Sequence, residues 1–227
     1  MNTSIKKTFQ AMKDFAALAI LSACLISCSK DRLTASGDKS TETRTVKQFT
    51  GIESSGANDI HISYGTEFRV MLKGSDNLLP YFKTEVLGNT LRLGYERVNV
   101  KHDDVEIYVT LPALNYISLS GSGDATISGS FPQLNVLQVL ISGSAELEAE
   151  NSLQTDELLV KISGSGEVDL KRVQSNSAEL SISGSGEAKI GACQHLKARI
   201  SGSGKVYYTG TPLIDSQIGG SGKLLKL

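Results

Sequence analysis

The chain has 227 residues, with 23 basic and 24 acidic side chains, and its formal net charge is −1. A protein that binds nucleic acid needs a basic face to neutralise phosphates, so this balance excludes nucleic acid as the partner. The first 27 residues have the composition of an export signal and are set aside before the fold is considered.

The N-terminal segment has the parts of a lipoprotein signal peptide. Lys6, Lys7 and Lys13 form a basic region. The apolar stretch that follows, 15–27, is shorter than the roughly 20 residues that span a bilayer. It ends in Leu-Ile-Ser-Cys, a lipobox whose cysteine, Cys28, receives the lipid. We therefore predict a signal peptide at 1–27 and a lipid anchor at Cys28, which holds the mature protein in the outer membrane on the periplasmic or cell-surface side.

The other two cysteines need separate interpretations. Cys24 closes a similar sequence, Leu-Ser-Ala-Cys, and is an alternative anchor, but Cys28 is preferred because polar residues follow it. Cleavage before Cys28 removes three lysines and one aspartate, which leaves 20 basic and 23 acidic residues and a net charge of −3. Cys193 is then the single free thiol, so no intramolecular disulfide can form. With no basic cluster beside it, we expect Cys193 to be a small, buried or half-buried residue.

Residues 28–44 are polar and show no hydrophobic periodicity. Such a composition predicts a lipidated, flexible tether between the membrane and the domain. The folded β domain is expected to extend over 45–227.

Residues 45–112 are predicted to form short strands and hairpins. Ile60, Ile62 and Tyr64 alternate with polar residues, as the side chains of a half-buried strand do. The sequence Leu-Gly-Asn-Thr at 87–90 lies between two apolar runs and predicts a hairpin turn. No sustained helical period occurs in this part of the chain.

Residues 113–227 contain an internal repeat, and this repeat predicts the fold. A Ser-Gly-Ser-Gly motif follows an aliphatic residue at intervals of 22, 21, 20, 18 and 18 residues. The motif begins at Ser120, Ser142, Ser163, Ser183, Ser201 and Gly219. A 20-residue repeat cannot bury its own apolar face, but stacked repeats share one core. We therefore predict an all-β protein whose strand and hairpin region continues into a right-handed parallel β-helix (β-solenoid) of about six coils.

The apolar positions of the repeats share one parity that continues through the motif. Counting in twos from Ile162 gives Gly164, Gly166, Val168 and Leu170. The glycines are therefore predicted to face inward at a bend, where a bulky side chain would clash, and the serines to face outward. The last repeat carries lysine and loses apolar residues, as expected at an exposed end.

These features resemble the head-GIN-domain family of putative auto-transporter adhesins. The resemblance covers roughly 45–227. It rests on Phe-Thr-Gly-Ile-Glu-Ser-Ser-Gly-Ala-Asn-Asp-Ile at 49–60, on Leu-Gly-Asn-Thr-Leu at 87–91 and on the serial Ile-Ser-Gly-Ser-Gly motifs. It implies an exported lipoprotein with a β-helical fold and no established catalytic activity, and it transfers no functional residues.

The sequence contains no complete motif for a cofactor, a metal or a catalytic nucleophile. Gly-Ser-Gly-Lys at 202–205 and 220–223 lacks the Ser or Thr and the helix that complete a phosphate loop. His61, His102 and His195 lie on different predicted elements and share no motif with a serine. We therefore expect no cofactor, no metal and no catalytic residue.

Two sets of outward residues are candidate sites. Carboxylates from neighbouring coils should project from one face about 5 Å apart, where they could bind a hard cation or act on a sugar. The alternative is a solvated face partly neutralised by lysines. The candidate acidic patch consists of Glu146, Glu167, Asp169 and Glu187.

The second set is the outward serines of the motif. Either their hydroxyls bond to one another and to nearby backbone, or they form a flat polar strip for weak multivalent contacts with glycans or a cell-surface protein. The candidate contact face consists of Ser163, Ser165, Ser183, Ser185, Ser201 and Ser203.

Three functions remain open. The first, which the resemblance also favours, is a lipid-anchored binding or adhesion module of the cell envelope without catalytic activity. The second is a carbohydrate-active β-helix enzyme that uses the outward carboxylate face. The third is a structural or regulatory envelope protein that works through another protein. An enzyme should show a cleft in which charged groups converge, whereas a module should show a flat surface.

Overall fold

The computed structural model describes residues 32–96 and 98–227, so the predicted signal peptide and lipid anchor lie outside the described residues. Leu33–Leu227 form one compact unit. Within the described ranges, no helix is long and apolar enough to cross a membrane.

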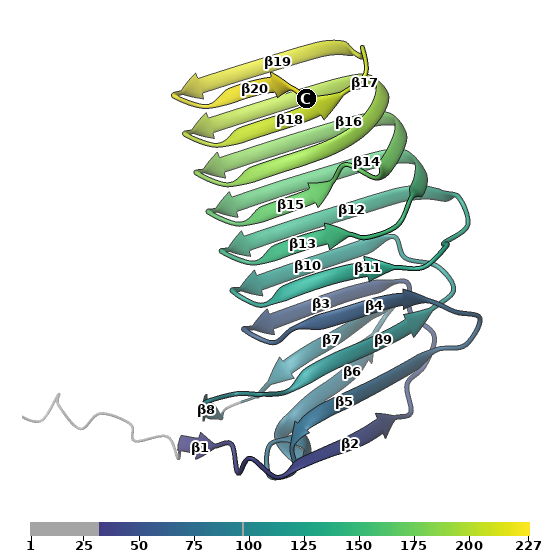
Figure 1. Ribbon diagram of the computed structural model, residues 1–227, viewed down its shortest axis with the longest axis vertical. Helices are drawn as coiled ribbons and strands as arrows, with labels where there is room; N and C mark the ends of the chain where they lie inside the picture. The colour runs from purple at the N-terminus through teal and green to yellow at the C-terminus, as the bar shows by residue number, and fades with distance from the viewer. Residues whose placement is uncertain (1–31, 97) are drawn as a thin grey trace, which may run out of the picture. The chain divides into compact units, whose positions relative to one another are not determined.

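The strands form two stacked sheets that share β17 (Figure 1). The front sheet contains, in spatial order, β2 (Lys39–Arg44), β5 (Arg69–Ser75), β9 (Glu106–Leu111), β4 (Ile60–Tyr64), β11 (Asp124–Ser128), β13 (Glu146–Ala149), β15 (Glu167–Leu170), the first part of β17 (Glu187–Gly202), β18 (Lys205–Thr209) and β20 (Lys223–Lys226). The back sheet contains β6 (Phe82–Leu87), β7 (Thr90–Tyr95), β3 (Gly51–Gly56), β10 (Tyr116–Gly121), β12 (Leu134–Gly143), β14 (Leu153–Gly164), β16 (Val173–Gly184), the rest of β17 and β19 (Leu213–Gly220). A separate pair joins β1 (Arg32–Thr34) to β8 (Asn99–Lys101), and one 3-10 turn spans Leu79–Tyr81.

Each rung of the stack consists of one back strand followed by one front strand. Five successive parallel pairings join β10 to β12, β14, β16, β17 and β19, so six rungs make five full turns. As the chain rises in Figure 1, the nearer sheet runs to the right and the farther one to the left, which is a right-handed coil. The predicted parallel β-solenoid is confirmed.

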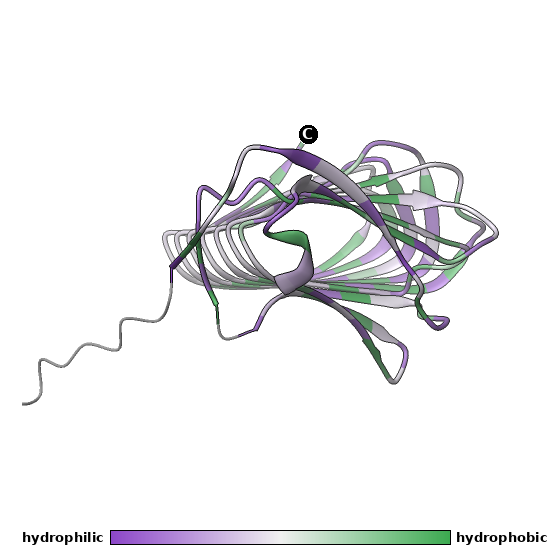
Figure 2. Ribbon diagram, turned by 90° about the horizontal axis from the view of Figure 1, so that it is seen from below, coloured by the Kyte–Doolittle hydropathy of each residue, from purple (hydrophilic) through white to green (hydrophobic). Residues whose placement is uncertain are grey.

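The core lies between the two sheets, which enclose it when the molecule is viewed along the stack (Figure 2). Ile162 pairs with Ile182, and Ile182 with Ile200, and all three are at most 2% exposed. The front sheet contributes a matching column of Val168, Ala188 and Val206, each 0% exposed. These columns confirm the predicted inward parity. Each buried aliphatic side chain contributes about 1.5–3 kcal/mol relative to exposure.

The glycines of the motif allow the rungs to turn at this spacing. Gly184 has φ +121°, and a Cβ atom there would lie 2.4 Å from the carbonyl oxygen of Gly164 one rung below. A Cβ at Gly186 would lie 2.5 Å from Cγ2 of Ile162. The first glycine is thus required by backbone conformation and by the preceding rung, and the second by the packed core.

The stack begins earlier than predicted. Strand β3 pairs with β10 so that Ser55 and Gly56 lie in register with Ser120 and Gly121, and β4 pairs with β11. Residues 51–64 therefore form a rung below the six predicted ones. The division at 112/113 between a hairpin part and a solenoid part does not correspond to a structural boundary.

The prediction of a flexible tether over 28–44 is wrong for the residues that the structure describes. Six residues of β2 pair antiparallel with β5, and β1 pairs with β8. Nη2 of Arg44 donates to the carbonyl oxygen of Leu79 at 2.7 Å. Strand β2 is polar because it is an edge strand whose side chains are nearly all exposed, so it lacks the apolar alternation of an interior strand.

Candidate functional site

The motif serines line one edge of the stack, where each rung turns from the back sheet into the front sheet (Figure 1). Backbone bonds hold this edge: the amide of Ser185 donates to the carbonyl of Gly164, and that of Ser203 to the carbonyl of Gly184, both at 2.9 Å. We call the six predicted residues the serine edge, and all six are exposed: Ser163, Ser165, Ser183, Ser185, Ser201 and Ser203.

Over 32–96 and 98–227, the hydroxyls of the six residues of the serine edge form no hydrogen bond with another protein group, so they do not make a bonded ladder. The edge is a row of polar groups at the inter-strand spacing of about 4.8 Å. Its use as a contact face stays a prediction.

The four carboxylates of the acidic patch lie on the outward face of the front sheet, as predicted. Glu146 pairs with Glu167, and Glu167 with Glu187. Asp169 occupies the next outward position and pairs in register with Lys189. The patch is therefore an open strip on a sheet face.

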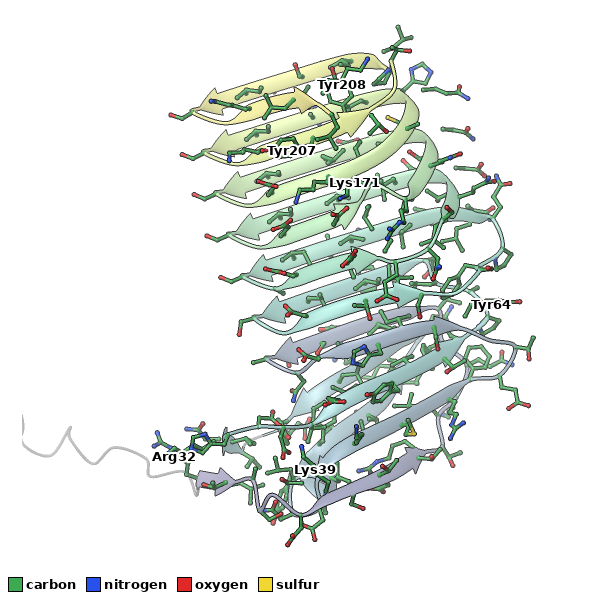
Figure 3. All side chains as sticks on the ribbon, in the orientation of Figure 1. Arg32, Lys39, Tyr64, Lys171, Tyr207 and Tyr208 are labelled. Atoms are coloured by element: carbon green, nitrogen blue, oxygen red, sulfur yellow. The ribbon has the colours of Figure 1, made fainter. Side chains whose placement is uncertain are left out.

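Two lysines neutralise most of the patch, and one of them, Lys171, is labelled in Figure 3. Nζ of Lys189 lies 2.5 Å from Glu167 and 3.2 Å from Glu187. The hydrogen bond with Glu167 is the main reason that the pKa of Lys189 is raised well above its usual value. Lys171 pairs with Asp169 at 2.9 Å. Three of the four carboxylates thus form ion pairs, which favours the interpretation as a charge-balanced face over a pair of free catalytic acids.

A small polar cluster that the sequence did not reveal lies lower on the front sheet. The Tyr108 hydroxyl donates to Glu106 at 2.7 Å, and the His61 ring stacks on Tyr108 with ring centroids 4.7 Å apart. The hydrogen bond between Tyr108 and Glu106 lowers the pKa of Glu106 and raises the pKa of Tyr108. Nζ of Lys73 lies 3.9 Å from Glu106. These groups lie on neighbouring strands of the front sheet.

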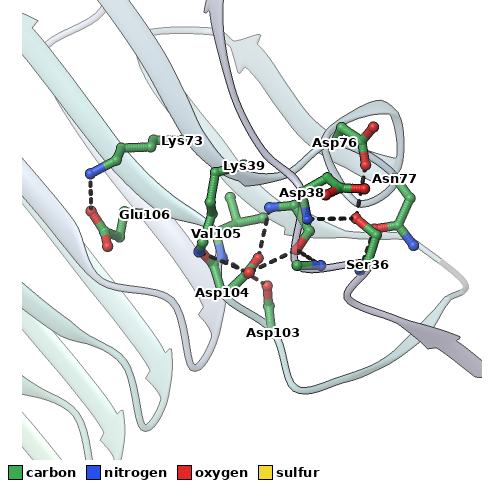
Figure 4. A network of polar contacts seen from close by, with 12 residues as sticks. Ser36, Asp38, Lys39, Lys73, Asp76, Asn77, Asp103, Asp104, Val105 and Glu106 are labelled. Atoms are coloured by element: carbon green, nitrogen blue, oxygen red, sulfur yellow. Dashed lines mark hydrogen bonds and ion pairs between the residues drawn. The ribbon is translucent and has the colours of Figure 1, made fainter.

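A denser polar network fastens the N-terminal end of the unit (Figure 4). Asp104 accepts from the backbone amide of Ser75 at 2.8 Å and from its hydroxyl at 2.7 Å, and Lys39 lies 2.8 Å away. Burial raises the pKa of Asp104, but the hydrogen bonds from Lys39 and Ser75 outweigh it, so the pKa lies below its usual value. Burial also raises the pKa of Tyr95, and its 2.8 Å bond to Asp103 adds to this effect. The network joins β2, β5 and the 103–105 segment and is structural.

Another polar surface lies at the edge of the stack opposite the serine edge, where the chain passes from the front sheet into the back sheet. It is a shallow groove of about 330 Å³ lined by side-chain amides and hydroxyls, and we call it the amide groove. Its principal residues are Gln133, Gln154, Gln174, Asn176, Cys193 and Gln194. Cys193 is half-buried in its wall, as expected, and burial raises the pKa of its thiol.

Sequence reasoning missed the amide groove although a signal was present. Glutamine recurs at Gln133, Gln154, Gln174 and Gln194, at intervals of 21, 20 and 20 residues. The first two intervals equal those of the serine motif from Ser142 to Ser163 and Ser183, so Gln133, Gln154 and Gln174 fall at matching places in successive rungs. The motif then advances by only 18 residues, so Gln194 aligns with Asn176 instead.

Solved structures from Bacteroidetes share this fold. A protein of Bacteroides fragilis described as a putative adhesin is 22% identical, with a TM-score of 0.73, and the match covers 86% of this chain and 100% of that one. A Parabacteroides distasonis protein described as a putative lipid binding protein is 23% identical, with a TM-score of 0.59 and coverages of 87% and 100%. A putative adhesin of Parabacteroides merdae is 21% identical, with a TM-score of 0.60 and coverages of 87% and 99%. No curated protein matches the chain.

The family comparison is more specific than these structural similarities. A single family model matches residues 48–212, which is most of the compact unit and includes all the rungs up to the start of β19. The chain belongs to the family described as "Putative auto-transporter adhesin, head GIN domain".

Proposed function

We propose that this protein is a non-catalytic binding or adhesion module, held at the outer membrane by a lipid on Cys28. The observation that carries the proposal is the register of its polar columns. Identical outward groups recur on successive rungs in the serine edge, and Gln154 and Gln174 repeat in register in the amide groove. Contacts that are individually weak then act together, so affinity comes from their number.

The ion pairs on the front sheet support a module over an enzyme. General acid-base catalysis on a sugar uses two carboxyl groups in different protonation states that face a common bond. Here Glu167 and Glu187 share Lys189, and Asp169 is paired with Lys171.

The lipid anchor rests on the sequence. Only three residues separate Cys28 from Arg32, where β1 begins. Attachment through Cys28 would therefore hold the solenoid close to the membrane surface, as suits a protein that acts on material at the envelope.

A binding experiment tests this function. The chain from Ser29 to Leu227, which contains the whole compact unit, is biotinylated and added to isolated cell envelopes and to intact cells. We expect saturable retention that survives several washes and that an excess of unlabelled chain removes. Retention no greater than that of an unrelated biotinylated protein would reject the binding module.

A further inference from the structure

The amide groove contains two kinds of polar side chain, bonded and free. The bonded set runs across the rungs: Gln133 donates to Asp156 at 2.9 Å, and Asn176 donates to the same oxygen at 3.0 Å. Gln194 continues the series with a 3.5 Å bond to Asn176. These bonds fix the positions of the amides and satisfy Asp156.

The free set is the adjacent column. Gln154 and Gln174 pair in register on neighbouring strands and are both exposed. Among the residues that the structure describes, neither side chain forms a hydrogen bond with another protein group. Each amide offers two N–H donors and one carbonyl acceptor. The groove therefore presents unused donors and acceptors about 4.8 Å apart along the stack, beside a column that is already ordered.

The chemistry of the groove limits what it can bind. Among the residues that the structure describes, no lysine or arginine lines the groove, so these residues supply none of the cations that bind phosphate or sulfate. Its less polar groups are those of Ala192 and Cys193, too few to bury an acyl chain. Amide and hydroxyl groups are instead suited to a ligand that is itself rich in neutral donors and acceptors. We propose that the amide groove binds a neutral glycan that lies along the stack.

The shape of the groove agrees with a chain-like ligand. It crosses several rungs, so a polymer with hydroxyls at short intervals can repeat the same contact on each one. Tyr64 lies farther down the same edge, 39% exposed, with its ring held edge-on against Phe131 (Figure 3). This exposed aromatic side chain provides a further surface for a long glycan. The inference rests on the proposed function and specifies its site and ligand class.

The test uses the chain from Ser29 to Leu227 and an array of neutral glycans (dextran, mannan, galactan and β-glucan), with alginate and heparin as anionic probes. The groove variant is Gln154→Ala with Gln174→Ala. Its matched control is Gln138→Ala with Gln217→Ala, two glutamines on back-sheet strands outside the groove. Unchanged circular dichroism melting shows that each variant is folded.

We expect the unmodified chain to bind at least one neutral glycan. The groove variant should bind it at least tenfold more weakly, about 1.4 kcal/mol, and the control should stay within twofold. Full binding by the groove variant, or binding of the anionic probes alone, overturns the inference. If Ser163→Ala with Ser183→Ala abolishes binding instead, the serine edge is the contact surface and the proposed function stands. If no glycan binds but cell envelopes still retain the chain, the glycan inference is wrong and the proposed function stands. If neither glycans nor envelopes bind the chain, the proposed function is wrong as well.

Cys193 gives an independent readout, because it is the single cysteine between Ser29 and Leu227 and lies in the groove wall. A saturating neutral glycan should slow its modification by a thiol reagent several-fold. An unchanged rate at saturation would place the glycan elsewhere.

Discussion

Replacing a bend glycine tests how the rungs are held together. Gly184→Ala adds one methyl group at φ +121°, 2.4 Å from the carbonyl oxygen of Gly164. A non-glycine residue in such a conformation costs about 1–3 kcal/mol. The clash adds to this cost because its partner is backbone that is already bonded between the rungs. We expect the free energy of unfolding to fall by about 2–4 kcal/mol.

Urea unfolding of the chain from Ser29 to Leu227 measures this loss, and two variants separate its causes. Gly210→Ala also places alanine at positive φ (+81°), but its nearest neighbour is 3.6 Å away, so it should lose only about 1–2 kcal/mol. Ser183→Ala removes an exposed hydroxyl and should change stability by less than about 0.5 kcal/mol. If Gly184→Ala is no worse than Gly210→Ala, close approach of the rungs is not what requires glycine. If Ser183→Ala is as damaging as Gly184→Ala, the outward assignment of the serines is wrong.

Three further predictions follow from the core, the N-terminal network and the signal segment. Ile182→Asp buries an unpaired carboxylate between two rungs and should cost more than about 3 kcal/mol in urea unfolding, whereas a loss under 1 kcal/mol would contradict the inward column. Because the pKa of Asp104 is lowered on folding, the Asp104 carboxylate contributes to the free energy of unfolding above its unfolded pKa of about 3.9. This contribution is lost as pH falls through the pKa of the folded protein. In the Asp104→Asn variant, the free energy of unfolding should therefore fall less steeply as the pH is lowered, and an unchanged pH dependence would refute this. Mass spectrometry of the mature N-terminus should show an acylated Cys28, and a mature chain that begins at Cys24 or is unmodified would defeat the anchor prediction.

The solenoid was predictable because stacking makes each column of the repeat chemically uniform. Ile162, Ile182 and Ile200 occupy equivalent places in the sequence repeat and pair directly in the structure. The same count of two placed Gly186 against the core side chain of Ile162, whereas Gly184 faces the backbone of the preceding rung and not the core. Periodicity of this kind can be recognised in the sequence without any knowledge of the turn geometry.

The first rung was missed because its motif has changed. Ala57 and Asn58 stand where later rungs have serine and glycine. Asn58 is buried, and its amide donates to the carbonyl oxygen of Val105 at 3.0 Å and to Asp103 at 2.7 Å. This rung is adapted to the N-terminal strands below it, and such long-range contacts leave no local pattern.

The positions of the candidate site residues were predictable from the sequence, but the ion pairs that they form were not. Counting placed Glu167 and Glu187 on one face and predicted partial neutralisation by lysines as the alternative. It could not give the particular ion pairs that Lys189 forms, because these depend on the side-chain conformation of each residue. Strand β2 was taken for a tether because a polar edge strand and a polar linker have the same composition.

The most direct test of the binding-module account asks whether the chain holds a polysaccharide without cutting it. The chain from Ser29 to Leu227 is incubated with the neutral glycan that it retains best, and the length distribution of the glycan is followed by size-exclusion chromatography. The account predicts a stable complex and an unchanged length distribution, both for the unmodified chain and for the variant that combines Glu146→Gln, Glu167→Gln and Glu187→Gln. Shortening of the glycan by the unmodified chain but not by that variant would contradict the account and identify the front-sheet carboxylates as a catalytic site.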